Sequence, residues 1–376
     1  MKSKAIILII VLLLAVQVKA EWLAKSQPML YEQPTSNAFL QQISKPFIRI
    51  ADTNYVTDLT STFIIRGLNS FKTCGFNIED KQSLLALRYR SDTIASIGAG
   101  INYKWLSFGL QLSTGRRAKH VIGRQNHINI QILQPTFNIK TDISEYNGLF
   151  VYNKDSIICG LPRNDYYIRN DLKYIKLRIQ ADYVINHNKY SAAAATGLNT
   201  IQKKTVGSFL LGAEWEANII MADSSLVPSN VNDSLFAYKS NINGISNITF
   251  GVTTGYAMNV VLPKGFFVHG TYVVGVGTDR KTIRDQTADD LRYRSLASMF
   301  RAEIATGYNC RRFYAGAWIN YSVNRSKIGS TAANIYTESL AIRIVFAYRI
   351  FLKKDYPLNI GGMRDMVNDL RQRNWN

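Results

Sequence analysis

Polar and apolar residues alternate along most of the chain. Between positions 175 and 185, Ile175, Leu177 and Ile179 fall on one side, whereas Lys176 and Arg178 fall on the other. A period of two residues is typical of a β-strand, because successive strand side chains point to opposite faces. This segment is therefore predicted to be a strand with one apolar and one polar face.

The same alternation recurs in many segments, several of them longer than the roughly five to six residues usual in soluble domains. Candidate strands lie near 61–70, 72–79, 83–91, 94–103, 105–114, 126–134, 136–150, 173–186, 189–199, 204–221, 246–261, 265–277, 293–309, 312–324 and 334–351. Short turns are expected at 91–93 and 186–188, and longer loops near 115–125, 151–172, 222–244 and 278–292.

Long alternating strands suit a membrane better than a soluble domain. Crossing the hydrocarbon takes about 9–11 residues of a tilted strand, and only a closed barrel pairs every edge group in lipid. We therefore predict an all-β fold, a single antiparallel transmembrane up-and-down β-barrel of about 12–14 strands. A soluble β-sandwich or lipocalin-like barrel, which would also alternate, is the alternative.

The N-terminus has the layout of a secretion signal. Lys2 and Lys4 precede an apolar run over 5–16, and a small-x-small motif follows at 18–20. This predicts a signal peptide at 1–20. The rest divides into an irregular periplasmic lead-in at 21–58, the barrel at 59–352 and a periplasmic tail at 353–376, where 363–373 can form a short helix. The expected location is the outer membrane of a Gram-negative bacterium.

The chain is strongly basic. Removing the signal's three lysines, Lys2, Lys4 and Lys19, takes the formal charge from +19 to +16. Such a charge favours anionic partners, for which outer-membrane lipid and glycolipid phosphates are the prediction. A secretion signal and the absence of a binding motif argue against nucleic acid. Three cysteines with no metal-like spacing give neither a disulfide framework nor a metal site, so no cofactor is expected.

The polar strand faces predict a charged lumen. Charges of both signs on a small circumference should pair, because an isolated charge in a confined space is costly. A lumen largely filled by side chains is expected, and an anion-selective pore is the alternative because basic residues outnumber acidic ones. The predicted network comprises Arg88, Arg90, Lys176, Arg178, Asp182, Glu214, Glu216, Arg301, Glu303, Arg343 and Arg349.

Two further features are candidates for binding or chemistry. A basic loop with Arg116, Arg117, Lys119 and Arg124 is either an anion-binding loop or a solvated charged loop. His127 falls in one polar row with Asn129 and Gln131, and a hydrolase would need such a histidine to hold a serine and an orienting partner. The sequence brings no particular serine to His127, so a hydrogen-bonding role in the lumen is the simpler interpretation.

Several motifs together resemble a known family. They are DTNYV at 52–56, LRYR at 87–90, SIGAGINYKWL at 96–106, QKKTVGSFLLG at 202–212 and DSSLVP at 223–228. Over about residues 50–352 the chain resembles the uncharacterised Bacteroidetes outer-membrane barrel family catalogued as domain of unknown function 4421. Ser91 and Asp92 stand where family patterns often have Pro-Asn. The resemblance implies a barrel in the outer membrane and supplies no function.

Three functional hypotheses follow. The first is a non-enzymatic barrel with a structural or interaction role, whose protein partners are unknown. The second is a porin-like small-solute or anion channel, which requires a continuous water path past the lumen charges. The third is a barrel lipid hydrolase, which requires His127 or His269 to meet a serine and a carboxylate or amide in three dimensions.

Overall fold

The computed structural model describes residues 51–80, 86–113, 123–152, 167–196, 198–228, 241–286, 290–328, 333–356 and 360–371. The predicted signal peptide at 1–20 and most of the predicted lead-in lie outside these residues, as do Arg116, Arg117 and Lys119 of the basic loop.

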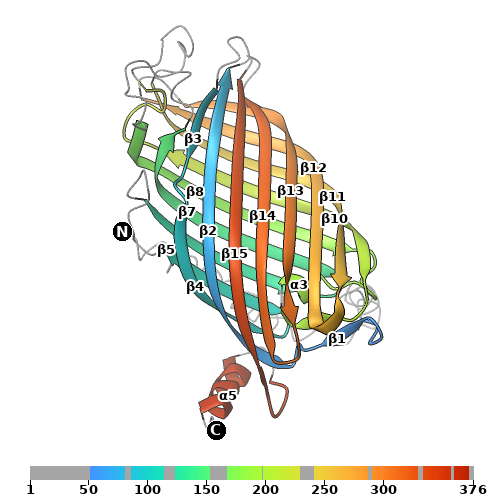
Figure 1. Cartoon of the computed structure of the whole chain (residues 1–376). Helices are drawn as coiled ribbons and strands as arrows, with labels where there is room; N and C mark the ends of the chain where they lie inside the picture. The colour runs from blue at the N-terminus through green and yellow to red at the C-terminus, as the bar shows by residue number, and fades with distance from the viewer. Residues whose placement is uncertain are drawn as a thin grey trace, which may run out of the picture. The chain divides into compact units, whose positions relative to one another are not determined.

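Thirteen described strands form one antiparallel sheet that closes on itself (Figure 1). β15 (Ala333–Phe351) pairs along its whole length with β2 (Thr62–Asp80), and this pairing closes the ring. The predicted up-and-down β-barrel is thereby confirmed. The other strands are β3 (Ala86–Arg90), β4 (Ile94–Tyr103), β5 (Leu106–Ser113), β6 (Arg124–Leu133), β7 (Phe137–Val151), β8 (Tyr167–Val184), β10 (Val206–Met221), β11 (Ile242–Val261), β12 (Phe266–Asp285), β13 (Leu291–Asn309) and β14 (Phe313–Ile328).

β3 and β4 run in line along one edge of β2. β3 pairs with residues 75–79 of β2, and β4 pairs with residues 63–72. At the break between them, the Ser91 N–H donates to the carbonyl of Cys74, and the Cys74 N–H donates to Ser91 Oγ at 2.9 Å. The expected turn at 91–93 is therefore wrong, because these hydrogen bonds carry the ladder across the break. The thirteen described strands occupy twelve positions around the ring.

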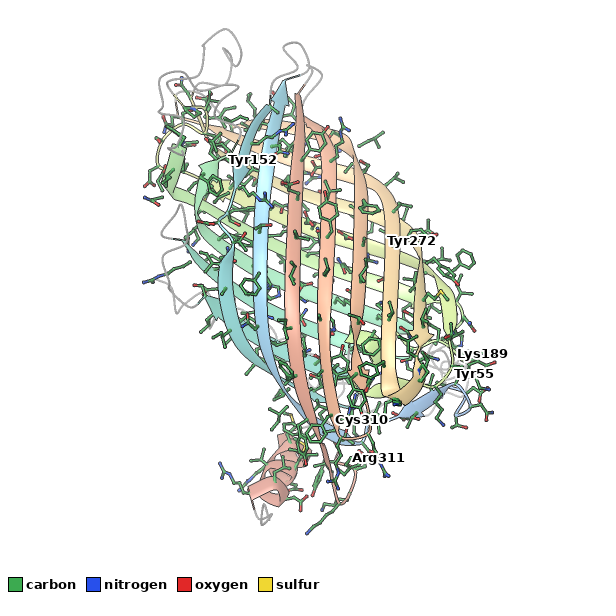
Figure 2. The ribbon with its side chains drawn as sticks, viewed as in Figure 1. Tyr55, Tyr152, Lys189, Tyr272, Cys310 and Arg311 are labelled. Carbon is green, nitrogen blue, oxygen red and sulfur yellow. The ribbon has the colours of Figure 1, made fainter. Side chains whose placement is uncertain are left out.

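The barrel wall is apolar outside and polar inside. Leu296, Val276 and Phe346 face outward and expose 79%, 66% and 63% of their surface, whereas inward-facing Glu216 and Asn218 are fully buried. Soluble proteins rarely expose a contiguous apolar belt of this kind, but lipid covers one on a membrane barrel. Figure 2 shows Tyr272 projecting from this outer wall. The side-chain distribution is that of a membrane-spanning barrel.

Aromatic pairs ring the outer wall at the end of the barrel where β7, β12 and β14 begin. In each pair a phenylalanine lies directly opposite a tyrosine on the next strand, with ring centroids 5.1–5.4 Å apart. Aromatic girdles mark the boundary between hydrocarbon and headgroups, so this level fits one membrane interface. The pairs are Phe137–Tyr183, Phe209–Tyr256, Phe266–Tyr308 and Phe313–Tyr348.

The lower end of the lumen is filled by the connection between β8 and β10. This segment holds the single-turn helix α3 (Ala193–Thr196), which lies within the lower end of the barrel (Figure 1). Tyr314 Oη donates to the carbonyl of Ala195 at 2.9 Å, and Arg349 Nε donates to the carbonyl of Leu198 at 2.8 Å. Ala195 and Leu198 pack among apolar residues of the wall. These contacts form a lower core at this end of the lumen.

A small two-stranded sheet lies beside this plug. β1 (Val56–Asp58) pairs with β9 (Thr200–Gln202), so the end of the predicted irregular lead-in is a strand. Lys189 Nζ lies 5.2 Å from the centre of the Tyr55 ring, and Figure 2 shows the two residues together. The chain before β2 and the β8–β10 connection are thus joined by backbone pairing.

The upper end of the lumen is filled by a second apolar cluster. Phe76, Leu87 and Tyr89 line it from the wall, and Leu226 enters it from the segment after β10. Tyr89 Oη donates to the carbonyl of Leu226. Arg169 holds the same segment by donating to the carbonyls of Ser224 and Ser225. This upper core lies at the end opposite α3.

Helix α5 (Ile360–Arg371) follows the last strand. Met366 of this helix packs with Tyr103 and Tyr356. Tyr103 Oη donates to the carbonyl of Tyr356 at 2.7 Å. Among the described residues, no helix is both long and apolar enough to cross a membrane.

Several other predicted boundaries are wrong. The strands predicted at 61–70 and 72–79 are the single strand β2, and β8 begins at Tyr167, inside the loop predicted at 151–172. Residues 189–199 were expected to be a strand, but they form turns and α3, because Ala193–Thr196 and Leu198 are buried in the lower core. Residues 278–285 were expected to be loop, but β12 continues to Asp285. Asp279 and Lys281 of this extension are both buried and pair with each other at 3.0 Å, so their charges are matched where β12 continues as part of the barrel wall.

Candidate functional site in the lumen

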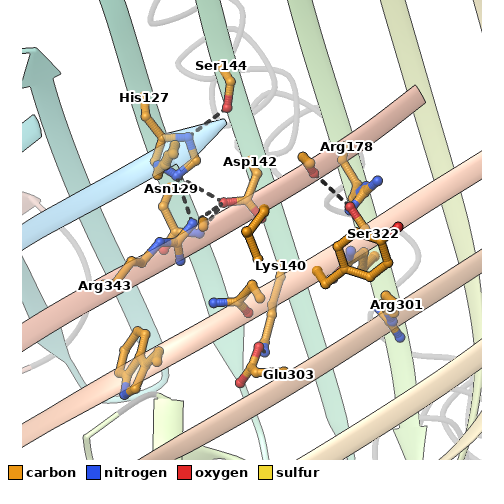
Figure 3. A pocket seen from close by; sticks show the side chains of 18 of the residues that line it. His127, Asn129, Lys140, Asp142, Ser144, Arg178, Arg301, Glu303, Ser322 and Arg343 are labelled. Atoms are coloured by element: carbon orange, nitrogen blue, oxygen red, sulfur yellow. Dashed lines mark hydrogen bonds and ion pairs between the residues drawn. The ribbon is translucent and has the colours of Figure 1, made fainter. Parts of the chain in front are cut away.

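A polar chamber lies between the two apolar end cores. The inward-facing residues of β8 follow this order along the strand. Leu172 and Tyr174 belong to the upper core, and Val184 is buried near the lower end of the strand. Lys176 and Arg178, which are also buried, lie between them. The chamber contains a cavity of about 130 Å³ lined by residues of β2, β6, β7, β8, α3, β12, β13, β14 and β15 (Figure 3). A polar cavity of this size has room for several water molecules.

One wall of the chamber, on β8 and β10, is fully charge-paired. Arg178 Nε donates to Glu216 Oε2 at 2.6 Å and lies 3.2 Å from Glu214 Oε1. Lys176 Nζ lies 3.4 Å from Glu216 Oε2. Asn218 Nδ2 donates to the other Glu216 oxygen at 2.8 Å. Every oxygen of the Glu216 carboxylate is therefore engaged, as burial of a carboxylate requires.

Two further ion pairs cross the lumen. Lys140 of β7 reaches Glu303 of β13 with 3.3 Å between Nζ and Oε2, and Arg301 of β13 pairs with Asp182 of β8. These strands are several positions apart around the ring. The two pairs bridge the barrel and divide the space that an open pore would need.

A third group surrounds His127 on β6. His127 Nδ1 lies 2.8 Å from Ser144 Oγ, and Nε2 lies 3.2 Å from Asp142 Oδ1 (Figure 3). Asn129 Nδ2 donates to the same Asp142 oxygen at 2.9 Å. Arg343 Nη2 approaches from β15, 3.3 Å from His127 Nε2 and 3.8 Å from Asp142 Oδ1. The lumen therefore brings a serine, a histidine and a carboxylate together.

The opposite wall, on β2, β14 and β15, contains donors without acceptors. Lys72 is 4% exposed, and its Nζ has no hydrogen-bond partner although it lines the cavity. Arg343 Nε and Asn320 Nδ2, which belong to residues lining the same cavity, are also buried and unpartnered. Buried polar groups are nearly always hydrogen-bonded, so three orphan donors at one cavity require an explanation.

The structure places eight residues of the predicted charge network in the chamber and its walls. They are Lys176, Arg178, Asp182, Glu214, Glu216, Arg301, Glu303 and Arg343.

Three residues of that network lie elsewhere. Arg88 and Arg90 face away from the lumen, because Leu87 and Tyr89 take the inward positions of β3 in the upper core. Arg90 instead lies over the ring of Tyr152 at 6.0 Å. Arg349 points inward but meets no carboxylate; it donates to backbone carbonyls and to Asn309 Oδ1 at the lower plug. Arg124 of the basic loop is exposed at the start of β6.

Sequence reasoning missed Lys72, Lys140, Asp142 and Ser144. Lys140, Asp142 and Ser144 occupy alternate positions on β7, so the alternation of polar residues could have predicted that they face the lumen. Lys72 gave no such signal, because its inward row also contains Leu68, Cys74 and Phe76. The row passes from one apolar core through the chamber to the other, so apolar residues fall on the polar side.

Residues 50–349 match the protein family described as Domain of unknown function (DUF4421). The chain belongs to this family. The match spans the barrel from before β1 almost to the end of β15, which covers the chamber and both end cores.

Solved structures similar to this member of the family are outer-membrane barrels. They include the Escherichia coli outer membrane protease OmpT (10% identity, 78% of this chain and 98% of that chain, TM-score 0.37). They also include the Pseudomonas putida toluene transporter TodX (8%, 77% and 91%, TM-score 0.26). A third is the translocator domain of the Neisseria meningitidis autotransporter NalP (11%, 84% and 95%, TM-score 0.24). At these identities and TM-scores, none of the three bears on activity or substrate.

No curated protein matches the chain. Within the described residues, no group of three or more His, Cys, Asp or Glu side chains is arranged to hold a metal ion. Cys74 is buried and Cys310 half-buried, and both are free thiols. The polar groups of the chamber that can bind or react are therefore its ion pairs, its histidine cluster and its unpartnered donors.

Proposed function

We propose that this protein is a closed outer-membrane barrel with a non-enzymatic structural or interaction role. The observation that carries the proposal is that the lumen has an apolar core at each end and ion pairs across its middle. A conducting pore needs a continuous polar path, which neither core offers. The predicted signal peptide at 1–20 would deliver the chain to the outer membrane of a Gram-negative bacterium.

Conductance of the refolded mature protein in a planar bilayer tests this proposal. We expect no channel steps from protein whose folding and insertion are verified by heat-modifiable mobility and protease resistance. Stable, salt-dependent steps would reject the closed barrel in favour of an anion channel, and neutralising Arg178 and Arg343 would then be the next experiment.

A plug-replacement variant sharpens the test. Asn186 Nδ2 donates to the carbonyl of Gly207 at 2.9 Å, so a short Gly-Ser linker can replace residues 187–206 without separating β8 from β10. This variant removes the lower plug and leaves the upper core intact. We expect it to stay silent as well, because the upper core closes the lumen independently.

The interaction role that we propose includes contact with the phosphates of outer-membrane lipid and glycolipid. The supporting observation is charge, since the chain is strongly basic and Arg124 is exposed on the outside of β6. Vesicle binding by the wild type and by a variant with Arg116, Arg117, Lys119 and Arg124 changed to Gln tests it. Equal affinity of both proteins for vesicles containing lipid phosphomonoesters would remove the loop from the proposal.

A lipid hydrolase is a second candidate, favoured by the meeting of Ser144, His127 and Asp142. With its proton on Nε2, His127 donates to Asp142, and the Ser144 hydroxyl can then donate to Nδ1. In this tautomer the imidazole can take the serine proton. Arg343 Nη2, 3.3 Å from the same Nε2, favours the opposite tautomer and places this candidate second.

Covalent labelling separates the two candidates. Ser322, which pairs with Ser339 at 2.7 Å in the same chamber and has no histidine partner, provides the matched control. If the barrel is a hydrolase, a fluorophosphonate probe labels the wild type and Ser322→Ala but not Ser144→Ala. For the closed, non-enzymatic barrel we expect no labelling of any of the three.

A further inference from the structure

The chamber contains one lysine that forms no ion pair with a carboxylate of the described residues. Lys140 pairs with Glu303, Arg301 with Asp182, and Lys176 and Arg178 share Glu214 and Glu216. Arg343 lies 3.8 Å from Asp142, whose carboxylate also holds His127 and Asn129. Among the described residues that line the cavity, Lys72 remains without a hydrogen bond or an ion pair.

Lys72 lies next to a second cation. Arg343 of β15 is directly opposite Ser70 of β2, and Lys72 is two residues further along β2 on the same face. Lys72 and Arg343 are therefore diagonal neighbours, a separation that long side chains readily span. Two like charges at this spacing repel each other, and the single Asp142 carboxylate near them can balance only one.

The free donors surround the same space. Lys72 Nζ, Arg343 Nε and Asn320 Nδ2 are buried without partners, and all three residues line the cavity. Two acceptors in the lining, Gln131 Oε1 and Glu303 Oε1, also lack hydrogen bonds. The Gln131 amide can rotate to present its nitrogen instead, and Glu303 is already neutralised by Lys140. The chamber therefore holds more positive charge than its carboxylates balance.

We propose that the chamber binds a small oxyanion of the phosphate class between Lys72, Arg343 and Asn320. Its volume, about 130 Å³, is close to the roughly 150 Å³ of an apolar cavity that holds a benzene molecule. A free phosphate fits such a space, and the apolar end cores exclude the acyl chains of a phospholipid or glycolipid. The proposal goes beyond a closed barrel, which needs no ligand.

Phosphate binding to the whole refolded barrel tests this site. The mature protein is refolded in matched buffers containing inorganic phosphate or chloride, because a closed lumen admits the ion most readily during folding. We expect retention of radiolabelled phosphate near one per barrel and an unfolding midpoint that rises with phosphate concentration, as mass action requires for a ligand of the folded state.

Variants assign the site to its residues. Lys72→Met should weaken phosphate binding at least tenfold, and Lys72→Arg, which retains the charge, should recover most of it. Lys204→Met removes the same charge from an exposed position outside the chamber and should bind phosphate like the wild type. Asn320→Leu should give a smaller loss than Lys72→Met, because it removes a neutral donor.

Three outcomes overturn the proposal. In the first, the wild type has the same unfolding midpoint in phosphate as in chloride and retains no phosphate. The second is a folded Lys72→Met that binds phosphate as the wild type does. The third is stabilisation only by vesicles containing a lipid phosphomonoester, which would place the anion site on the surface. Because none of these outcomes uses conductance, the site and the closed barrel can fail separately.

Discussion

The two walls of the chamber carry charge in different ways. On β8 and β10, Arg178 and Lys176 contact Glu216, and the barrel buries the whole group with its charges matched. On β2, Lys72, which lines the chamber, and Arg66, which does not, are both buried, and neither forms an ion pair with a described carboxylate. A Cβ added at Gly109 would lie 2.9 Å from Arg66 Nη2, so this glycine leaves room for the guanidinium. The comparison teaches that the interior concentrates its unbalanced positive charge on one wall.

Breaking the paired wall should have the largest effect. Glu216→Ala leaves Arg178 and Lys176 buried without their shared carboxylate, and breaking a buried ion pair in this way costs about 3–5 kcal/mol. We expect the free energy of unfolding to fall by that amount, measured from the urea midpoint of the barrel in vesicles.

A matched ion pair outside the lumen provides the control for that loss. Glu145 and Lys173 are 2.9 Å apart and both are partly exposed, so Glu145→Ala should cost less than about 1 kcal/mol. Equal losses for Glu145→Ala and Glu216→Ala would mean that burial does not distinguish the paired wall.

The end cores should respond next. Leu226 fills the upper core and Leu198 the lower one, and both are fully buried. Truncation of a buried leucine to alanine costs about 2–5 kcal/mol, because transferred surface is lost and a cavity remains. We expect both variants to lower the urea midpoint, and an unchanged midpoint for Leu198→Ala would show that the lower plug is not packed against the wall.

Removing a charge from the unpaired wall on β2 should raise the free energy of unfolding, whereas breaking the paired wall lowers it. In buffer without oxyanions, Lys72→Met removes a buried charge that has no partner, so the free energy of unfolding should rise by about 1 kcal/mol. The measurement is the same urea titration as for Glu216→Ala. A decrease as large as that of Glu216→Ala would contradict the distinction between the two walls.

The smallest expected effect concerns pH at the upper rim. Asp171 lies beyond the apolar part of β8, where Arg169 donates to both of its oxygens at 2.8 Å. This hydrogen bonding with Arg169 lowers the pKa of Asp171, against the smaller opposing effect of burial. The Asp171–Arg169 pair therefore contributes fully to stability above about pH 3.9, the pKa of an aspartate in the unfolded chain. This contribution is lost as the pH falls through the lower pKa that Asp171 has in the folded protein.

Comparison with Asp171→Asn isolates this contribution. The wild type should lose up to about 1 kcal/mol relative to the variant as the pH falls below about 4, because the pair is partly exposed. Identical pH profiles of the two proteins would show that Arg169 holds the segment at 224–225 without help from Asp171.

The sequence by itself determined the wall of the barrel. Strict alternation along β8, β10 and β15 predicted which side chains face lipid and which face the lumen, because lipid accepts only apolar groups over the whole length of a spanning strand. It also predicted that charges of both signs would lie inside. These properties depend on each strand alone, and a period of two is readable without knowing the neighbours.

Only the tertiary structure decided what fills the lumen. Residues 189–199 alternate like a strand, but Ala195 and Leu198 pack into the lower core, and Leu226 of the DSSLVP motif fills the upper one. Whether a cation is matched depends on which strands face each other across the ring. Lys140 meets Glu303 more than 150 residues away, whereas Lys72 forms no ion pair with any described carboxylate. Periodicity predicts the face on which a side chain lies, whereas its partner is set by the closure and register of the barrel.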